Sequence, residues 1–451
     1  MKVVVVGGGI AGLAAARRLE AVVPDAELVL VERSERLGGK LLTERDDGFV
    51  VEGAADSFLS RKPRGVGMAE ELGLELIDRS PENAGSFVRH GAELHPLPEG
   101  LTGMIPTDLE ALERSALLSE DGKRRLAEEA DLPPAPPDGD ESIAAFVTRR
   151  LGREAYERLV EPLLTGIYGG DGEQLSLQAT FPQLRRLELE HGSLLRGLAS
   201  SAPPAAASAP FVSFRDGMAT LVERLVSELQ RTRIVTGRAV VALSSGYELG
   251  LDDGERLVVD GVVLAVPAFE VAELTADLDP ELAAVHAEIP YASSAIVTLA
   301  IRGERQLGGY GYVVPRAEGS DVLACTWSSS KWEHRAPPGF ALIRVYLGRF
   351  GGRDVTADSD DALVAAAREE LRLAGLDGEP ERTWIHRWPL GMPQYVLGHP
   401  ERLERISAAL ARHPGLALAG AAYRGVGIPD CIHSGEEAAR SLTRALGMVV
   451  G

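Results

Sequence analysis

The chain opens with a continuous β-branched run, Val3 to Val6, and the apolar residues from about Ile10 to Ala21 then recur at helical spacing. Such a run is typical of a strand covered on both faces. A second apolar run, residues 26–32, ends at Glu32. The N-terminal region therefore predicts a strand–helix–strand unit.

Helical spacing returns between about Leu101 and Leu164, and Ser119 and Asp140 each precede a helical stretch as capping residues would. Gly152 is expected to end the second of these helices. Proline-rich segments at 133–140 and 201–210 predict loops. From about 291 to 388 the runs are strand-like, with one helix near 358–375.

This order predicts an α/β protein whose Rossmann-like nucleotide domain is assembled from separated segments. A mixed-sheet substrate domain and a helical insertion lie between those segments. The expected boundaries are 1–80, 206–270 and 400–451 for the nucleotide domain, 81–100 and 271–399 for the sheet domain, and 101–205 for the helical domain.

Composition narrows the class of partner. With 451 residues the chain is too long for one compact core. A net charge of −20 argues against nucleic acid or anionic lipid as the main partner, and an anionic substrate would need a local basic cluster. Two cysteines cannot form a disulfide framework.

The apolar run at the N-terminus, Val3 to Val6, is too short for the core of a signal peptide. Prolines interrupt the longest window without charged residues, so this window is no membrane span. We expect a cytoplasmic protein without an integral membrane span.

The first glycine turn fits the pattern G-x-G-x-x-G as Gly7, Gly9 and Gly12, directly between a strand and a helix. Its glycines allow a tight turn, close approach to a pyrophosphate, and close helix packing. The helix that begins at Ile10 and Ala11 would direct free N–H groups at the phosphates. Glu32, at the end of the next strand, has the position expected of a ribose-binding acid.

Two further segments indicate FAD rather than NAD. Gly38, Gly39 and Lys40 follow Glu32 closely, a spacing similar to the R-x-G-G-R/K signature of two-dinucleotide-domain flavoproteins. A glycine-rich turn at 420–431 would return to the first turn and contact the flavin, with the start of a helix near its N1–C2 edge. The expected cofactor-binding residues are Gly7, Gly9, Ile10, Ala11, Gly12, Glu32, Arg33, Gly38, Gly39, Lys40, Val240, Gly420, Tyr423, Gly427 and Ile428.

Further stretches extend the pattern along nearly the whole chain: GFVVEGAADSFLSRK, LHPLPEGLTGMIPTDL, EPLLTGIYGGDGEQLSLQATFPQL, RWPLGMPQYVLGH and YRGVGIPDCIHSGEEAA. Together they resemble the oxygen-dependent protoporphyrinogen and coproporphyrinogen III oxidases of the flavin amine oxidase superfamily. Within that family the chain is similar to the soluble Gram-positive and actinobacterial coproporphyrinogen oxidases.

The resemblance implies FAD-dependent oxidation of coproporphyrinogen III to coproporphyrin III in haem biosynthesis. Hydride would pass to flavin N5 in three rounds, with O2 as acceptor and H2O2 as by-product, and no side chain need act as a catalytic acid or base. It also implies a transient contact with a ferrochelatase. The alternatives are a protoporphyrinogen IX oxidase, a flavin amine oxidase, and a non-enzymatic binding protein of the same fold.

The substrate residues follow from the same resemblance. Gly166 and Gly169 would let a flat ring approach the backbone, and Tyr168 would either line that wall or pack in the core. The propionates need cations, for which Arg61 and Lys62 in the segment RKPR are the first candidates, with Arg64 beside them, and Arg185 and Arg186 a second option. Trp388 and Tyr395 either border the flavin or belong to the core.

The histidines and cysteines suggest no further chemistry. The nine histidines show no metal-ligand spacing, and His386, His399 and His433 are interpreted as core or surface residues. Cys431, close to the C-terminal glycine turn, is interpreted as a small buried residue rather than a covalent flavin attachment site.

Overall fold

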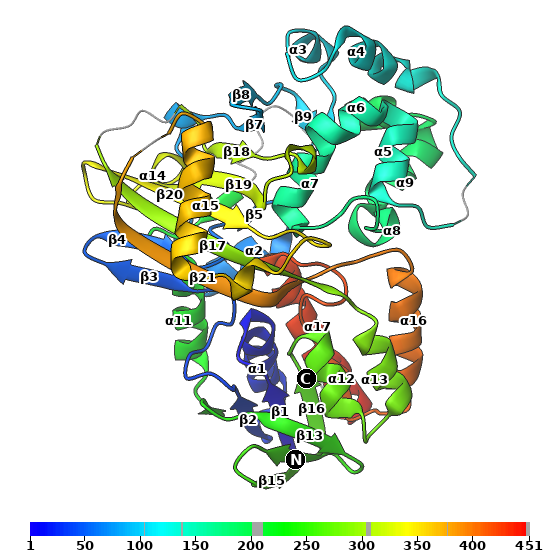
Figure 1. The fold of residues 1–451 in the computed structure, drawn as a ribbon. Helices are drawn as coiled ribbons and strands as arrows, with labels where there is room; N and C mark the ends of the chain where they lie inside the picture. The colour runs from blue at the N-terminus through cyan, green and yellow to red at the C-terminus, as the bar shows by residue number, and fades with distance from the viewer. Residues whose placement is uncertain (103, 137–138, 201–210, 304–307, 377, 448–451) are drawn as a thin grey trace.

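A five-stranded parallel sheet forms the base of the molecule, as Figure 1 shows. The computed structural model describes residues 1–102, 104–136, 139–200, 211–303, 308–376 and 378–447. The strand order is β12 (Thr232–Val235), β2 (Glu27–Val31), β1 (Lys2–Val6), β16 (Gly261–Leu264) and β22 (Leu416–Leu418), and every pairing is parallel. Segments far apart in the sequence thus build one sheet, as expected.

Side chains alternate between two cores on the faces of this sheet, because successive residues of a strand point to opposite sides. Val3 and Val5 contact one helical layer, whereas Val4 and Val6 contact the other. The first layer contains α1 (Ile10–Val22), α2 (Pro63–Glu71), α11 (Ala219–Glu228) and α17 (Ile428–Ala445). The second contains α12 (Ala268–Thr275), α13 (Pro280–Ala287) and α16 (His399–Leu410), with the sheet β13 (Val240–Ser244), β14 (Glu248–Leu251) and β15 (Arg256–Val258).

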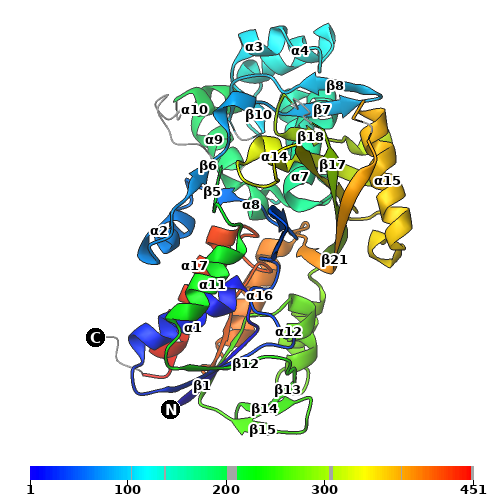
Figure 2. The ribbon, with the colours of Figure 1, turned by 90° about the vertical axis from the view of Figure 1, so that its left-hand side faces the viewer.

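A seven-stranded mixed sheet lies above this base in both views (Figures 1 and 2). Among the pairings that the described residues form in this sheet, only β18–β7 is parallel. Helix α15 (Asp360–Leu373) packs on one face through Leu363, Ala367 and Leu371. The strand order is β21 (Pro380–Pro393), β17 (Tyr291–Arg302), β20 (Phe340–Leu347), β19 (Val322–Trp327), β18 (Gly311–Val313), β7 (Phe87–His90) and β8 (Glu93–Pro96).

Smaller elements connect these layers. The short strands are β3 (Thr43–Asp46), β4 (Phe49–Glu52), β5 (Phe58–Leu59), β6 (Ile77–Asp78), β9 (Leu101–Thr102), β10 (Ile105–Pro106) and β11 (Phe211–Ser213). The remaining α-helices are α3 (Leu109–Glu113), α4 (Glu120–Ala127), α5 (Ile143–Leu151), α6 (Arg153–Ala155), α7 (Glu161–Tyr168), α8 (Leu177–Thr180), α9 (Pro182–His191), α10 (Leu194–Ser200) and α14 (Ser328–Lys331). Short non-α turns are η1 (Pro81–Asn83), η2 (Glu128–Asp131), η3 (Tyr156–Val160), η4 (Arg316–Glu318) and η5 (Val355–Ala357).

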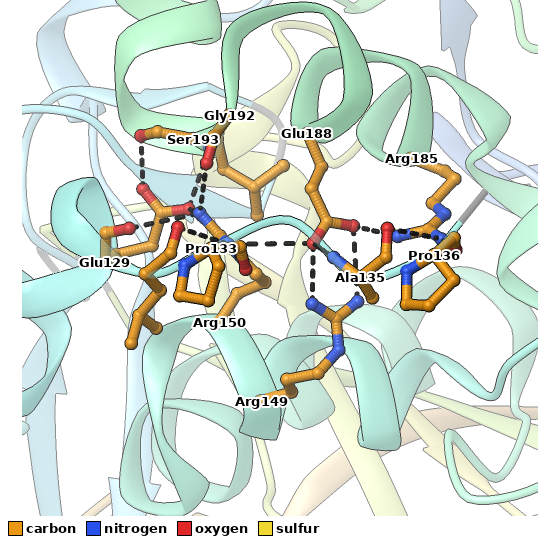
Figure 3. Close-up of polar contacts among 12 residues, drawn as sticks. Glu129, Pro133, Ala135, Pro136, Arg149, Arg150, Arg185, Glu188, Gly192 and Ser193 are labelled. Carbon is orange, nitrogen blue, oxygen red and sulfur yellow. Dashed lines mark hydrogen bonds and ion pairs between the residues drawn. The ribbon is translucent and has the colours of Figure 1, made fainter.

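A buried ion network holds the helical region together (Figure 3). Arg150 and Glu129 are both fully buried and bonded to each other, and Arg149 Nη1 lies 2.6 Å from Glu188 Oε1. Ser193 and the backbone N–H of Leu194 donate to the Glu129 carboxylate. The network therefore ties η2 to α5, α9 and the start of α10.

Several expected boundaries need correction. The cap of α5 is Ser142, which accepts from Ala145 N, because the Asp140 carboxylate accepts a hydrogen bond from Ser176 Oγ instead. Ser119 caps α4 and Gly152 ends α5 as predicted. The hairpin β9–β10 precedes the helical region, and strand β2 ends at Val31, one residue before Glu32. The predicted boundary at 270/271 falls inside α12, and the loop at 201–210 lies outside the described residues.

Candidate active site

The first glycine turn joins β1 to α1 under strict steric limits. Gly7 has φ +102°, and a Cβ there would lie 2.6 Å from the carbonyl oxygen of Ala265. A Cβ on Gly12 would lie 1.9 Å from the carbonyl oxygen of Gly7. Gly9 precedes α1 without a side-chain cap, so the first-turn N–H groups, which include those of Ile10 and Ala11, point to a site that suits an anion.

The second glycine turn lies directly against the first. Gly38 N donates to Gly8 O at 2.8 Å, and a Cβ on Gly39 would lie 3.2 Å from Gly9 Cα. Arg36 stabilises this turn, because its guanidinium donates hydrogen bonds to the carbonyl oxygens of Leu37, Gly39 and Leu41. The two signatures that are separate in the sequence thus form one glycine-lined cradle.

Four charged groups surround this cradle. Glu32 accepts hydrogen bonds from Gly8 N at 2.7 Å and from Ser34 N at 2.9 Å. Arg33 Nη2 lies 2.6 Å from Glu270 Oε2, on the first turn of α12. Lys40, directly after Gly39, is exposed to solvent.

The C-terminal glycine turn leads into α17, on the same side of the sheet. Gly420 has φ +119°, and no described atom lies within 4 Å of the position of its Cβ. Gly427 N–H donates to Asp430 Oδ2 at 3.2 Å at the start of the helix, where Ile428 is buried in the core. The Tyr395 hydroxyl donates to Ala421 O at 2.6 Å and accepts from Gly425 N at 2.8 Å, so it fixes this turn rather than facing a ligand.

Two of the predicted cofactor residues present no side chain to an open site. Val240 is buried in the core beside the five-stranded sheet. The Tyr423 ring lies in the same core, with its hydroxyl 3.3 Å from His286 Nε2. Any contact of Tyr423 with a cofactor would therefore use its backbone.

Residues 52–57, the candidate second wall of the site, are held by side chains from the seven-stranded sheet and from α14. Lys331 Nζ lies 2.8 Å from Asp56 Oδ2, Arg344 donates to Ala54 O, and Trp388 Nε1 donates to Gly53 O at 2.8 Å. Burial alone would raise the pKa of Asp56, but Lys331 and Arg344 outweigh it and hold the pKa below its usual range. Arg344 is 1% exposed, and two of its nitrogens, Nε and Nη1, have no hydrogen-bond partner among the described residues.

Helix α7 presents a mixed surface at its C-terminal end. Gly166 is exposed, and Ile167 is 47% exposed. Tyr168 is buried, with its ring centroid 5.9 Å from that of Phe181, so the core interpretation of this tyrosine holds for its ring. Gly169 adopts a left-handed conformation and ends the helix. The sequence singled out Tyr168, whereas the neighbouring Ile167 carries the exposed apolar surface.

The arginine and lysine side chains that are expected to bind propionates differ in whether they already form ion pairs within the protein. Arg61 is exposed and has no charged partner among the described residues, whereas Lys62 Nζ lies 2.5 Å from Asp430 Oδ2. Arg64 pairs with Glu71 and Glu436. Arg185 is bound to Glu188 and to the Pro136 carbonyl in the helical network, so it offers no free guanidinium, whereas Arg186 is exposed.

The remaining titratable groups are structural. His386 Nε2 lies 2.7 Å from Glu44 Oε1, and His399 Nε2 lies 2.9 Å from Tyr423 O, whereas His433 is exposed. Burial raises the pKa of the Cys431 thiol to about 12, which keeps it protonated and unreactive.

The described residues contain no group of His, Cys, Asp and Glu that could hold a metal ion. No helix among them is long and apolar enough to cross a membrane.

Comparison with known proteins gives matches along nearly the whole chain. A coproporphyrinogen III oxidase from Bacillus subtilis (strain 168) is 38% identical and covers 97% of this chain and 96% of its own. A coproporphyrinogen III oxidase from Staphylococcus aureus is 33% identical, over 98% of this chain and 99% of its own.

A crystal structure from Exiguobacterium sp. 255-15, described provisionally as a protoporphyrinogen oxidase, superposes with a TM-score of 0.88. It is 36% identical and covers 98% of each chain. The family model described as flavin containing amine oxidoreductase matches residues 10–443. The glycine cradle and the discontinuous sheet agree with that match, and this chain belongs to the flavin-containing amine oxidoreductase family.

Proposed function

We propose that this protein is an FAD-dependent oxidase that converts coproporphyrinogen III to coproporphyrin III with O2 as acceptor. The observation that carries the proposal is the match at 38% identity to a coproporphyrinogen III oxidase over 97% of the chain. The reaction removes three hydrides and three protons from the macrocycle and reduces three O2 to three H2O2.

The glycine cradle fits FAD in particular. The start of α1 would bind the pyrophosphate, and Glu32 would accept from the adenosine ribose. A dinucleotide that extends beyond the pyrophosphate needs a second support, which the turn at 420–427 offers, because Gly420 leaves open space at its Cβ position. Side chains at Gly9 or Gly39 would fill the gap between the two turns, where the chain has only glycine.

The chain's own residues would position the substrate. FAD, when bound, supplies the hydride acceptor. Gly166 and Ile167 are exposed at the end of α7 and would offer an apolar surface to a macrocycle. The segment 52–57 is held in place by Lys331, Arg344 and Trp388. With that geometry fixed in advance, orientation supplies much of the rate enhancement and no side chain needs to act as a base.

Arg61 is the residue that we assign to a propionate at the mouth of the site. It is exposed and unpaired within the described residues, whereas the neighbouring Lys62 and Arg64 are engaged in ion pairs. A protein of net charge −20 repels a tetra-anionic substrate at long range, so a free local cation has most effect at the entrance.

We also assign the parts of the chain to separate tasks. The layers around the five-stranded sheet, drawn from about 1–80, 206–270 and 400–451, hold the cofactor. The segments 81–100 and 271–399, with the helical region 101–205, surround the substrate, except that α12 and α13 pack with the cofactor-binding layers. A cytoplasmic location and a transient contact with a ferrochelatase, which would consume the product, complete the proposal.

The alternative is oxidation of protoporphyrinogen IX, which the assignment of the Exiguobacterium relative favours. Porphyrin fluorescence distinguishes the two, with the purified protein mixed in air with each freshly reduced porphyrinogen. We expect faster formation of coproporphyrin than of protoporphyrin, and none above autoxidation with cofactor-stripped protein. Equal rates with and without cofactor would overturn the proposal.

A further inference from the structure

The ion pair between Arg33 and Glu270 spans the carboxyl end of the central strand. Arg33 comes two residues after β2, and Glu270 lies in the first turn of α12, which follows β16. In the sheet β1 lies between these two strands, so β2 and β16 are about 10 Å apart. The pair, with Nη2 and Oε2 2.6 Å apart, therefore crosses the point where β1 enters the first glycine turn.

This crossing point would face the adenosine of an FAD bound as proposed. Dinucleotides bind outside the carboxyl ends of the strands in such sheets. Glu32, assigned to the adenosine ribose, immediately precedes Arg33. Ala265 directly follows β16, and its carbonyl oxygen would lie 2.6 Å from a Cβ on Gly7. The segment from Ala265 to Glu270 thus forms a third side of the cradle, which the sequence did not suggest.

The two partners differ in their freedom to move. The Glu270 side chain is 12% exposed, and α12 is anchored because Ala268 N donates to the Tyr291 hydroxyl at 2.7 Å. The Phe269 ring packs edge-on against Tyr291 as well. Arg33 is 58% exposed, so it can leave the pair by side-chain rotation while Glu270 stays in place.

We propose that Arg33 and Glu270 form a clasp across the adenosine end of the dinucleotide site, which slows release of the bound cofactor. The inference rests on the proposed function only in requiring a bound FAD. With the pair formed, the two side chains would cover this side of the bound cofactor. With the pair broken, the Arg33 side chain no longer covers it.

The clasp should also respond to pH. The charged or titratable groups that face Glu270 are Arg33, Glu32 and Lys40 from the segment after β2, Glu273 on its own helix, and Tyr291 on β17. Burial raises the pKa of Glu270, and Arg33 opposes the change while Glu273 and Glu32 add to it. Glu270 therefore takes up a proton at a higher pH than an ordinary glutamate, and protonation removes the charge that holds Arg33.

The test is the rate at which FAD leaves the purified protein, followed by the fluorescence of released flavin after dilution. Glu270→Gln and Arg33→Gln should each release FAD about two- to fivefold faster, as expected for loss of a partly exposed ion pair. The double variant should be no faster than either single variant. In the wild type release should accelerate as the pH falls, with a weaker dependence in Glu270→Gln.

The matched control is Glu273→Gln, which removes one negative charge from the same helix. Glu273 has no ion-pair partner among the described residues, so its removal should leave the release rate at neutral pH unchanged. A yellow Glu270→Gln protein that releases FAD at the wild-type rate would overturn the clasp alone, as would equal acceleration by Glu273→Gln. Because Arg33 is exposed, Arg33→Gln keeps the test valid if Glu270→Gln fails to fold. A chain that binds no FAD would overturn both this inference and the proposed function.

Discussion

Lys62 Nζ lies 2.5 Å from Asp430 Oδ2, and this pair joins the start of α2 to the first turn of α17. The chain thereby brings together two segments separated by more than three quarters of its length. Asp430 lies at the N-terminus of α17, where the positive end of the helix dipole attracts anions. An unpaired carboxylate there would reduce this attraction, and Lys62 neutralises it.

The first prediction concerns this pair. In Lys62→Gln, Asp430 keeps an uncompensated negative charge near the proposed flavin site, so the two-electron potential of the bound flavin should fall by about 10–20 mV. A dye-coupled reductive titration measures it. In Arg61→Gln, by contrast, KM for coproporphyrinogen should rise while the potential stays constant. A rise in KM without a potential change in Lys62→Gln would mean that Lys62 binds the substrate after all.

The glycine cradle gives a second prediction. A Cβ on Gly12 would overlap the carbonyl oxygen of Gly7, so Gly12→Ala should separate α1 from β1, reduce the flavin content and destabilise the protein by about 1–3 kcal/mol. The ratio of flavin to protein absorbance measures the loss. Gly308→Ala is the control, because a Cβ there would meet no described atom within 4 Å. Normal flavin content in Gly12→Ala would contradict the proposed cradle.

The buried network of the helical region gives a third prediction. Arg150→Met leaves the fully buried Glu129 carboxylate without its cation, which should cost about 3–5 kcal/mol of folding free energy. Thermal unfolding followed by circular dichroism should show a lower transition for the variant. Arg124→Gln, which breaks the exposed pair with Asp121, should change stability by less than about 1 kcal/mol. Equal effects of the two substitutions would show that the network contributes little.

Asp279 makes stability depend on pH. Burial alone would raise its pKa, but the Leu282 N–H, His413 and Arg412 outweigh burial and lower the pKa to about 2. A carboxylate with a lowered folded-state pKa stabilises the protein above its unfolded pKa, and this contribution is lost as the pH falls toward 2. Asp279→Asn should therefore cost about 1–2 kcal/mol at neutral pH. The difference from the wild type should shrink below pH ~4, and a difference independent of pH would contradict this origin.

The strand–helix–strand opening could be predicted because its signals are local. Four consecutive valines require burial on both faces, and Gly7 and Gly12 have no room for a side chain. Glu32 follows its strand directly. The other side of the same site could not be predicted, because Ala265 and Glu270 reach it only when β16 pairs with β1 from far along the chain.

Elsewhere the structure differs from the sequence-based expectation because neighbouring residues were equally suited to the same role. Asp140 and Ser142 are both good capping residues, and the hydrogen bond from Ser176 to Asp140 decides between them. Arg344 stands within a strand-like run, and only its contact with Ala54 reveals it as part of the site wall. On α7 the sequence could not tell which of Ile167 and Tyr168 faces outward, because apolar residues surround both.

The most direct test of the proposed oxidase is anaerobic mixing of the flavin-loaded protein with coproporphyrinogen III, followed by the visible absorbance of the flavin. We predict that the flavin absorbance bleaches on mixing and returns when air is admitted, with porphyrin formed and H2O2 released. A flavin that dithionite bleaches but coproporphyrinogen III leaves oxidised would contradict the central claim.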